Sequence, residues 1–378
     1  MLVLLNLLST TNASGRSVLV GHLSRLLAWA GEAHEFVGLC HAGNRDLREI
    51  LPRGIRWIEC PAWTGRWFGR AVWERTRLGG VVRRIGADVL FMASGTVVET
   101  CRIPQVSLAM NPWCLVPAAW TSRRDWAKAW LQRRAYRSAV RRAALMVYLS
   151  RYLRDAYVAN AGGAERDYVI APAGLNDDVL TACGQPGARD GHRPLRIVCV
   201  SLMAPHKGVE TVLEALALLR GRYALPAELH LVGGWPAPAY AQSMRALSRR
   251  LGLEAAVHIH GFVSRQTLFD HYAQASAFCL MSRCESFGIP AVEAQCFGTP
   301  VVSSNGCAIP EVCGAGGIYP APADREGTAA ALARLLTDPV EWSRYSQAAI
   351  ANAARYTYDL TAKPLLKVLE IGARTPKS

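Results

Sequence analysis

The chain of 378 residues carries a formal net charge of +14, and 51% of its residues are hydrophobic while only 19% are charged. This composition excludes a disordered chain, and the length exceeds what one hydrophobic core usually holds, so we expect two domains. The eleven cysteines are scattered and contain no C-x-x-C pair. They predict reduced thiols in a cytoplasmic protein, rather than a disulfide framework or a zinc site.

The chain opens on an apolar run, Leu2–Leu7, that we interpret as a buried first strand. A signal peptide is the alternative interpretation, but the run has no basic residues before it. It is too short to span a bilayer, and no other apolar run of the sequence reaches the required length.

Strand-length apolar runs then alternate with helical stretches through the first half of the chain. The further runs are Glu35–Leu39, Ile55–Glu59, Val89–Met92, Val106–Met110, Met146–Leu149 and Tyr168–Ile170. The helical stretches include Val18–Ala30, Trp73–Ile85 and Ser150–Ala159. Such alternation predicts an α/β domain with a doubly wound parallel sheet, which we assign to residues 1–182.

Most of the positive charge lies in this first half, and much of it lies in the segment 123–142. The segment predicts a basic helix that carries Trp126 and Trp130 one turn apart. Such a helix can lie on an anionic membrane surface at the inner face of the cytoplasmic membrane. The other interpretation, which stays open, is a solvated face whose tryptophans pack inward. We expect no nucleic-acid partner, because no recognised binding motif accompanies the charge.

A Gly- and Pro-rich interval at 183–194 predicts a linker, after which the alternation restarts in a second domain, 195–355. The expected strands of that domain are Ile197–Ser201, Glu228–Val232, Val257–His260, Ala277–Met281 and Pro300–Ser304. Helices are expected near Val209–Arg220, Tyr240–Leu251, Gln266–Gln274, Pro290–Phe297, Thr328–Leu336, Val340–Arg355 and Asp359–Ile371. Two doubly wound domains suggest a central cleft, and ligands of open α/β sheets bind beyond the carboxyl ends of the strands.

Two loops at such strand ends carry the candidate site residues. Lys207 and the following glycine lie between the strand ending at Ser201 and a helix, where an ammonium suits a diphosphate oxygen. Glu285 and Glu293 flank Gly288, which predicts a loop position for Glu285 and a helix from about Gly288 that contains Glu293. Backbone N–H groups at that helix start favour an anion, so the segment predicts a site for a phosphorylated sugar.

The order of residues from Glu285 to Val302 resembles the E-x7-E region of the retaining family-4 glycosyltransferases, which have the GT-B fold. In this chain Ser286 replaces a glycine of that region and Ile289 replaces a leucine. Weaker or shorter matches occur at the remaining positions of the resemblance: Lys207-Gly208, Gly233, Gly261, Pro310-Glu311, Tyr358-Asp359, Ser14-Gly15, 104–112, Ser150 and 174–176.

The resemblance implies a GT-B protein with two Rossmann-like domains, an acceptor-side domain followed by a nucleotide-sugar-binding one. It also implies that residues 356–378 form a helix that crosses back to the first domain. Glu293 would accept hydrogen bonds from ribose hydroxyls, Glu285 would contact the donor sugar, and Lys207 would neutralise the leaving diphosphate. The backbone of Phe287, Gly288 and Ile289 would face the donor, and Gly15 would let the first loop approach its phosphates.

The chain departs from the family at two positions. Leu202 stands where most members have an arginine, and we name His206 or Arg16 as sources of the missing charge. Met110 and its neighbours lack the histidine that many members place near the reacting carbon, so we expect only Asn111 near the acceptor. The sequence shows no convincing D-x-D motif, so we expect no metal and no cofactor beyond the donor substrate.

The resemblance implies a retaining hexosyltransferase that uses a nucleotide-diphosphate sugar and a glycan or lipid-linked acceptor, in bacterial surface polysaccharide or glycolipid synthesis. Leaving-group stabilisation and positioning would carry the catalysis. Two alternatives stay open. One is a nucleotide-sugar epimerase or hydrolase of the same fold, and the other is a catalytically inactive GT-B-like binding partner.

Overall fold

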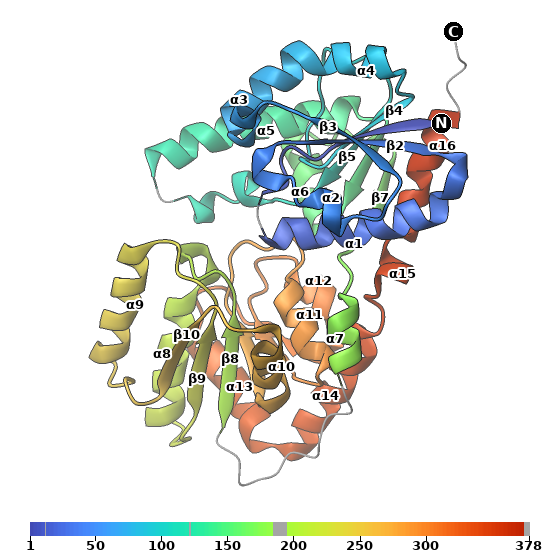
Figure 1. Ribbon diagram of the computed structural model, residues 1–378. Helices are drawn as coiled ribbons and strands as arrows, with labels where there is room; N and C mark the ends of the chain where they lie inside the picture. The colour runs from blue at the N-terminus through green and yellow to red at the C-terminus, as the bar shows by residue number, and fades with distance from the viewer. Residues whose placement is uncertain (12, 121, 184–194, 374–378) are drawn as a thin grey trace. The chain divides into compact units, whose positions relative to one another are not determined.

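A computed structural model describes residues 1–11, 13–120, 122–183 and 195–373 of the chain (Figure 1). The described residues form two compact units. Unit 1 comprises Met1–Leu115, Thr121–Gly174 and the C-terminal segment that starts at Thr357, and unit 2 comprises Val116–Trp120 and Leu175–Tyr356. The short helix α7 (Asp177–Ala182), which we assigned to the first domain, clusters with unit 2. Most of the expected linker, residues 184–194, lies outside the described part of the chain.

Unit 1 is built on a seven-stranded parallel sheet in the order β3-β2-β1-β4-β5-β6-β7. Its strands are β1 (Leu2–Asn6), β2 (Glu35–Cys40), β3 (Ile55–Glu59), β4 (Val89–Met92), β5 (Gln105–Ala109), β6 (Leu145–Tyr148) and β7 (Tyr168–Ile170). All five residues of β5 and all four of β4 and β6 are buried, which explains why these strands are continuous apolar runs. The expected strands of this half are therefore confirmed to within one residue at most ends.

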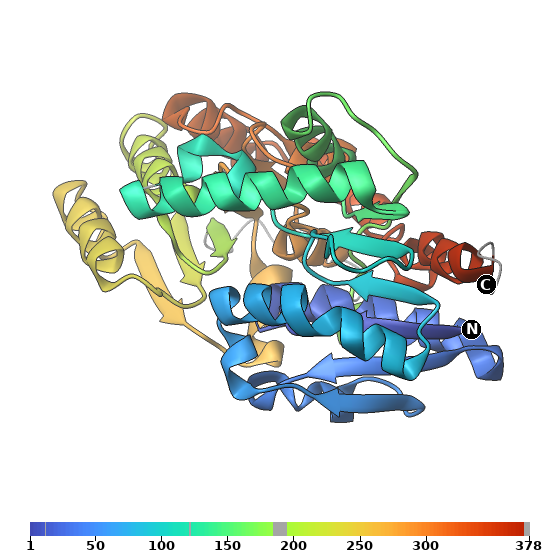
Figure 2. The ribbon, with the colours of Figure 1, turned by 90° about the horizontal axis from the view of Figure 1, so that it is seen from above.

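The helices of unit 1 are α1 (Ala13–Ala30), α2 (Leu47–Ile50), α3 (Trp67–Trp73), α4 (Gly79–Ile85), α5 (Arg123–Arg142), α6 (Arg151–Asn160), α15 (Tyr358–Thr361) and α16 (Lys367–Ala373). A π-helical stretch, Glu74–Leu78, joins α3 to α4, so the expected helix at 73–85 is not regular. Seen from above, α5 is one unbroken helix (Figure 2). Ser122 caps it by accepting a hydrogen bond from the Asp125 N–H at 3.1 Å.

The C-terminal segment of unit 1 is anchored by Tyr358. Its ring fills space that two glycines leave open, because a Cβ at Gly21 would lie 2.1 Å from the ring and one at Gly174 would lie 2.6 Å from it. The ring also meets His22 edge-on, with centroids 5.4 Å apart. The expected single helix at 359–371 is broken, because a 3-10 turn that contains Pro364 separates α15 from α16.

Unit 2 contains a six-stranded parallel sheet in the order β10-β9-β8-β11-β12-β13. Its strands are β8 (Arg196–Val200), β9 (Glu228–Val232), β10 (Val257–Gly261), β11 (Ala277–Leu280), β12 (Val301–Ser303) and β13 (Gly317–Ile318). Five of these follow the expected runs. The sixth, β13, has only two residues and is too short to give a sequence signal.

The helices of unit 2 lie on both faces of this sheet (Figure 1). They are α7, α8 (Val209–Gly221), α9 (Pro238–Arg250), α10 (Arg265–Gln274), α11 (Ile289–Cys296), α12 (Ile309–Cys313), α13 (Arg325–Thr337) and α14 (Pro339–Ala353). Helix α8 packs against α9 and α13, whereas α11 packs against α7, α10 and α14. The unit is thus doubly wound, as the alternation of strands and helices predicts.

The structure also corrects the prediction that all cysteines are reduced. Cys183, at the end of α7, forms a disulfide with Cys296, the last residue of α11, and their Cα atoms are 5.6 Å apart. A separation of 113 residues and the lack of any local spacing motif hide this pair in the sequence. The disulfide ties α7 to the helix that carries Glu293.

Candidate functional site: an ion pair before helix α11 and a buried glutamate within it

Lys207 and Glu285 lie on loops that follow neighbouring strands. β8 and β11 pair in parallel, so the segments that leave their carboxyl ends start at the same edge of the sheet. The Lys207 Nζ donates to the Glu285 Oε1 at 2.5 Å, and each side chain is only 15% exposed. The structure therefore brings together two residues that are 78 positions apart in the sequence. Their direct ion pair was not predicted, because we expected both to face a diphosphate.

The surroundings of this pair keep a positive charge on Lys207. Burial lowers the pKa of the ammonium, but the charge and the hydrogen bond of Glu285 outweigh burial, and the pKa is raised. His206 behaves in the opposite way, because burial and the Lys207 charge lower its pKa to about 4. At neutral pH this imidazole is uncharged, so His206 does not supply the charge that Leu202 fails to provide.

The turn that carries Lys207 is fixed by tight packing and by an arginine that sequence reasoning missed. Gly208 has a φ of +67°, and a Cβ there would lie 2.1 Å from the Met281 carbonyl oxygen. The Arg283 guanidinium donates to the Pro205 carbonyl at 2.8 Å and to the Glu210 carboxylate at 2.7 Å. Arg283, which lies in the loop of Glu285, thus stabilises the turn that carries Lys207. Leu202, at the position of the family's arginine, is 51% exposed.

Helix α11 begins as the sequence predicts. Gly288 is its N-cap with a φ of +94°, and a Cβ there would lie 2.7 Å from an Ile309 side-chain carbon. Pro290 occupies the first turn, where a missing N–H costs no helical hydrogen bond. Phe287 is 3% exposed and packs edge-on against Tyr356, with ring centroids 5.2 Å apart, which fixes the backbone just before the helix.

Glu293 lies inside α11 and is 6% exposed. The Tyr272 hydroxyl donates to its Oε2 at 2.9 Å, and the Arg265 guanidinium donates to its Oε1 at 3.3 Å. Burial raises the pKa of the carboxyl, and both Arg265 and Tyr272 oppose that shift. Glu293 therefore has a set of partners different from that of Glu285, although only eight positions separate the two residues.

Arg265 extends this second set of contacts to α7. Its guanidinium forms two hydrogen bonds with the Asp178 carboxylate, at 2.8 and 2.9 Å, and holds the pKa of that carboxyl below its usual range. The sequence analysis assigned no role to Asp178, Arg265 or Tyr272. Their spacing carries no signal, because α7 contributes Asp178 while α10 contributes Arg265 and Tyr272.

The expected site residues of unit 1 also have definite surroundings. Gly15 lies in the first turn of α1 and not on a loop, which corrects the expectation. A Cβ there would be 3.9 Å from the Met110 side chain, at the position that lacks a histidine. Arg16 is ion-paired with Asp46. Asn111 accepts a hydrogen bond from the Trp113 N–H at 2.9 Å and is exposed.

Comparison with known sequences finds similarity mainly in the second half of the chain. Residues 189–355 match the family model "Glycosyl transferases group 1". A protein of Mycolicibacterium hassiacum, "MMP alpha-(1->4)-mannosyltransferase", is 35% identical over 193 residues, which are 49% of this chain and 45% of that protein. A "GDP-mannose-dependent alpha-(1-6)-phosphatidylinositol monomannoside mannosyltransferase" of Mycolicibacterium smegmatis is 28% identical, over 72% of this chain and 67% of that protein. The match to the Mycolicibacterium hassiacum protein thus spans less than half of that protein's length.

Solved structures resemble nearly the whole chain. A sucrose-phosphate synthase of Thermosynechococcus elongatus superimposes with a TM-score of 0.75 at 19% identity and covers 98% of both chains. An Anabaena protein in complex with UDP-glucose has a TM-score of 0.72 at 18% identity, over 98% of this chain and 99% of its own. The two parallel sheets are those of the GT-B fold, an α/β architecture, which confirms the expected fold class. Residues 189–355 therefore resemble the group 1 glycosyl transferases in sequence, and the chain has the GT-B fold.

Proposed function

We propose that the protein is a retaining, metal-independent glycosyltransferase. It would move a hexose from a nucleotide-diphosphate sugar to a glycan or lipid-linked acceptor, in the synthesis of bacterial surface polysaccharide or glycolipid. The observation that carries this proposal is the part-buried ion pair between Lys207, in the turn before α8, and Glu285, in the loop before α11, within the segment that matches the family. Two relatives are named as mannosyltransferases, which supports a hexose as the transferred sugar.

Each residue of unit 2 has a role in this proposal. Lys207 faces the diphosphate as a fixed positive charge, and Glu285 accepts hydrogen bonds from the donor sugar. The backbone N–H groups from Phe287 to Ile289 approach the donor at the start of α11, where a helix favours an anion. Glu293 accepts hydrogen bonds from the ribose hydroxyls. Its hydrogen bonds with Tyr272 and Arg265 hold the carboxylate oriented for that purpose.

Three residues of unit 1 complete the proposal. Gly15 leaves room for the donor phosphates, and Arg16 adds positive charge next to them. Arg16 now pairs with Asp46, an exposed partner that a phosphate can replace. Asn111 is assigned to the acceptor, because its side chain is exposed.

If the transfer proceeds with retention, the partners of both glutamates argue against a double displacement through a glycosyl-enzyme. Glu285 is ion-paired with Lys207, and Glu293 is buried with a donor on each oxygen, so neither carboxylate is poised to attack the sugar. We therefore infer attack on the face that the leaving group vacates. The bond between the anomeric carbon and the phosphate oxygen breaks, the acceptor oxygen bonds to that carbon, and the acceptor proton passes to the leaving diphosphate. Lys207 stabilises the charge that develops on this diphosphate.

Helix α5 supports peripheral contact with an anionic membrane. Trp126 is 62% exposed and Trp130 is 55% exposed, so these tryptophans do not pack inward as the alternative interpretation required. Within the described residues, no helix is long and apolar enough to cross a membrane. The end of α6 is bound by three arginines from the middle and the end of α5, namely Arg133, Arg137 and Arg141. The first turns of α5, which carry the two tryptophans, are therefore the part that can face a membrane surface. Such contact at the inner face of the cytoplasmic membrane would bring a lipid-linked acceptor within reach.

The proposal is tested with a panel of UDP-, GDP- and ADP-sugars. We expect at least one to raise the melting temperature and to release its nucleotide when phosphatidylinositol monomannoside, named for the Mycolicibacterium smegmatis relative, is added. Absence of stabilisation by every nucleotide would reject the proposal. Rapid release of nucleotide without acceptor would favour the epimerase or hydrolase. Stable binding of nucleotide without turnover would favour the inactive binding partner. The presence of Leu202 in place of the usual arginine is the observation that supports this last alternative.

A further inference from the structure

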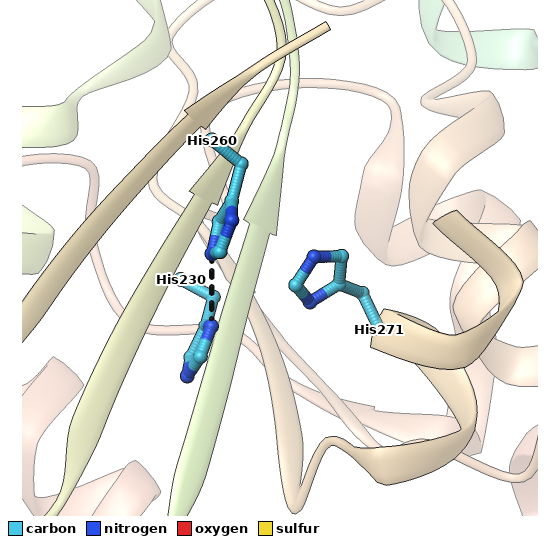
Figure 3. Close-up of side chains that lie close together, drawn as sticks. All are labelled: His230, His260 and His271. Carbon is cyan, nitrogen blue, oxygen red and sulfur yellow. Dashed lines mark hydrogen bonds between the residues drawn. The ribbon is translucent and has the colours of Figure 1, made fainter. Parts of the chain in front are cut away.

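Three histidines of unit 2 converge on one face of its sheet, apart from the residues assigned to the donor. His230 belongs to β9, His260 to the edge strand β10, and His271 to α10 (Figure 3). One ring nitrogen from each lies within 4.8 Å of the others. The His230 Nδ1 and the His260 Nε2 are 3.0 Å apart, and the ring centroids of His260 and His271 are 4.5 Å apart.

The sheet register produces this convergence. β9 and β10 are parallel, with His258 opposite His230, and a register shift follows between Ile259 and Gly261. His260 lies two residues beyond His258 and so shares its face of the sheet. Helix α10 starts after the N-cap Ser264 and carries His271 in its last turn, and Figure 3 shows that ring turned toward the two strands.

A metal binds histidine through a nitrogen of the neutral ring. His230 and His271 are buried, whereas His260 is exposed. The guanidinium of Arg196 opposes a cation nearby, but it is hydrogen-bonded to the side-chain oxygen of Gln274.

Glu228 offsets that positive charge from the other side of His230. Its Oε2 is 3.7 Å from the His230 Nε2 and 3.5 Å from the His258 Nε2. The His230 Nε2 is buried without a hydrogen-bond partner among the described residues. At this distance Glu228 makes no hydrogen bond to the His230 ring, and only its negative charge acts on the cluster. In this arrangement the other nitrogen, Nδ1, faces His260.

We propose that His230 Nδ1, His260 Nε2 and a ring nitrogen of His271 bind one divalent transition-metal ion, Zn²⁺ by ligand preference. Three neutral nitrogens suit a tetrahedral ion that keeps its fourth position for water, and two nitrogens bound at about 2.1 Å lie about 3.4 Å apart. The observed 3.0 Å between His230 and His260 is close to that separation. His260 is exposed, so both the ion and its water can reach the site from solvent.

The ion would fasten α10 to the edge of the sheet. Helix α10 also carries Arg265 and Tyr272, which donate to Glu293. The three histidines are thus positioning residues for that carboxylate, and the ion takes no part in the transfer. Metal-independent chemistry and a structural metal are compatible, and the two proposals can fail separately.

The test begins with full-length protein that has been freed of metal by a chelator and dialysed. Calorimetric titration with Zn²⁺ should show one equivalent bound, and Co²⁺ should give the intense visible absorption of a four-coordinate site. His260→Ala should weaken Zn²⁺ binding about a hundredfold or more, because even lesser changes around bound metals cost about 10- to 100-fold. This variant changes an exposed residue, so folding should be retained, which circular dichroism checks.

His258→Ala is the matched control on the same strand, and we expect it to retain one equivalent of Zn²⁺. Absence of stoichiometric binding by the wild-type protein would overturn the proposal, as would unchanged binding by His260→Ala. Loss of binding in His258→Ala alone would place the ion between Glu228, His230 and His258 instead, and would also overturn it. None of these readouts requires a donor sugar, so they do not depend on the proposed transferase activity.

Discussion

At the scale of single residues, Lys207 is the most informative position to change. Lys207→Ala removes the charge that stabilises the departing diphosphate, and the loss of one such group costs about 10²- to 10³-fold in kcat. We expect a fall of this size in steady-state nucleotide release. Lys363→Ala, which changes an exposed lysine of unit 1, is the matched control and should leave kcat unchanged. Equal activity of the two variants would remove Lys207 from the mechanism.

Glu293 tests nucleotide binding separately from chemistry. Glu293→Ala should weaken nucleoside diphosphate binding about 10- to 100-fold, because a hydrogen bond to a charged group contributes about 1.5–3 kcal/mol. Calorimetry measures the dissociation constant, and the exposed Glu254 provides the control variant Glu254→Ala. Unaltered affinity in a folded Glu293→Ala protein would contradict the ribose role.

The two glutamates also mark how far the sequence could predict the site. Gly288 and Pro290 indicated a loop before a helix, and the order of strands and helices indicated that Glu285 and Lys207 lie beyond carboxyl ends of strands. Their direct ion pair was not predicted. The partners of Glu293 were not predictable, because Tyr272 and Arg265 come from α10 and Asp178 comes from α7. Contacts between elements distant in sequence depend on tertiary packing, which no local spacing reports.

At the scale of elements, α5 is the segment whose environment the sequence left open. Its charge and its tryptophans fitted either a membrane surface or an inward-packed face. Only the exposure of the tryptophans in the folded unit distinguishes these two interpretations.

Regular strands were predictable because burial on both faces makes them continuous apolar runs. The π-helical stretch 74–78 and the two-residue β13 were not, since neither leaves a periodic pattern.

The membrane proposal predicts that α5 binds anionic vesicles. Replacing Trp126 and Trp130 with serine should reduce co-sedimentation with vesicles that contain phosphatidylglycerol, because these rings bury apolar area in the interface. Trp67→Ser is the control, since Trp67 is also 55% exposed and lies in the same unit. Equal sedimentation of the double variant and the wild type would contradict the role of α5.

At the scale of the whole molecule, acid should destabilise the fold through buried histidines such as His22. Its Nε2 is 2.9 Å from the Pro172 carbonyl oxygen, and its buried Nδ1 has no hydrogen-bond partner among the described residues. Burial lowers its pKa from 6.5 to about 4, so the folded state favours the neutral ring. The stabilisation is complete above pH 6.5 and is lost as the pH falls toward 4, by about 3 kcal/mol for His22.

Chemical unfolding monitored by circular dichroism at several pH values measures this loss. His22→Leu should lower the free energy of unfolding at pH 7.5, because the Pro172 carbonyl loses its partner. It should also reduce the difference in that free energy between pH 7.5 and pH 5. An unchanged pH dependence would show that the His22 ring is already charged in the folded protein.

The division into two doubly wound units was predictable from the sequence because each half repeats the alternation of strands and helices. The disulfide between Cys183 and Cys296 was not, because it joins residues 113 positions apart without a spacing motif. The histidine cluster was not predictable for the same reason. Its members are separated by up to 41 positions, and the register of β9 and β10 brings them together.

The proposed transferase activity is tested most directly by the anomeric configuration of the product. GDP-mannose or UDP-glucose is supplied with an acceptor in buffer without added Mg²⁺ or Mn²⁺, and the product is analysed by mass spectrometry and NMR. The proposal predicts one nucleoside diphosphate released per sugar transferred, with the anomeric configuration of the donor kept in the product and with transfer by Lys207→Ala about 10²- to 10³-fold slower. A product of inverted configuration, or transfer by Lys207→Ala at the wild-type rate, would contradict it.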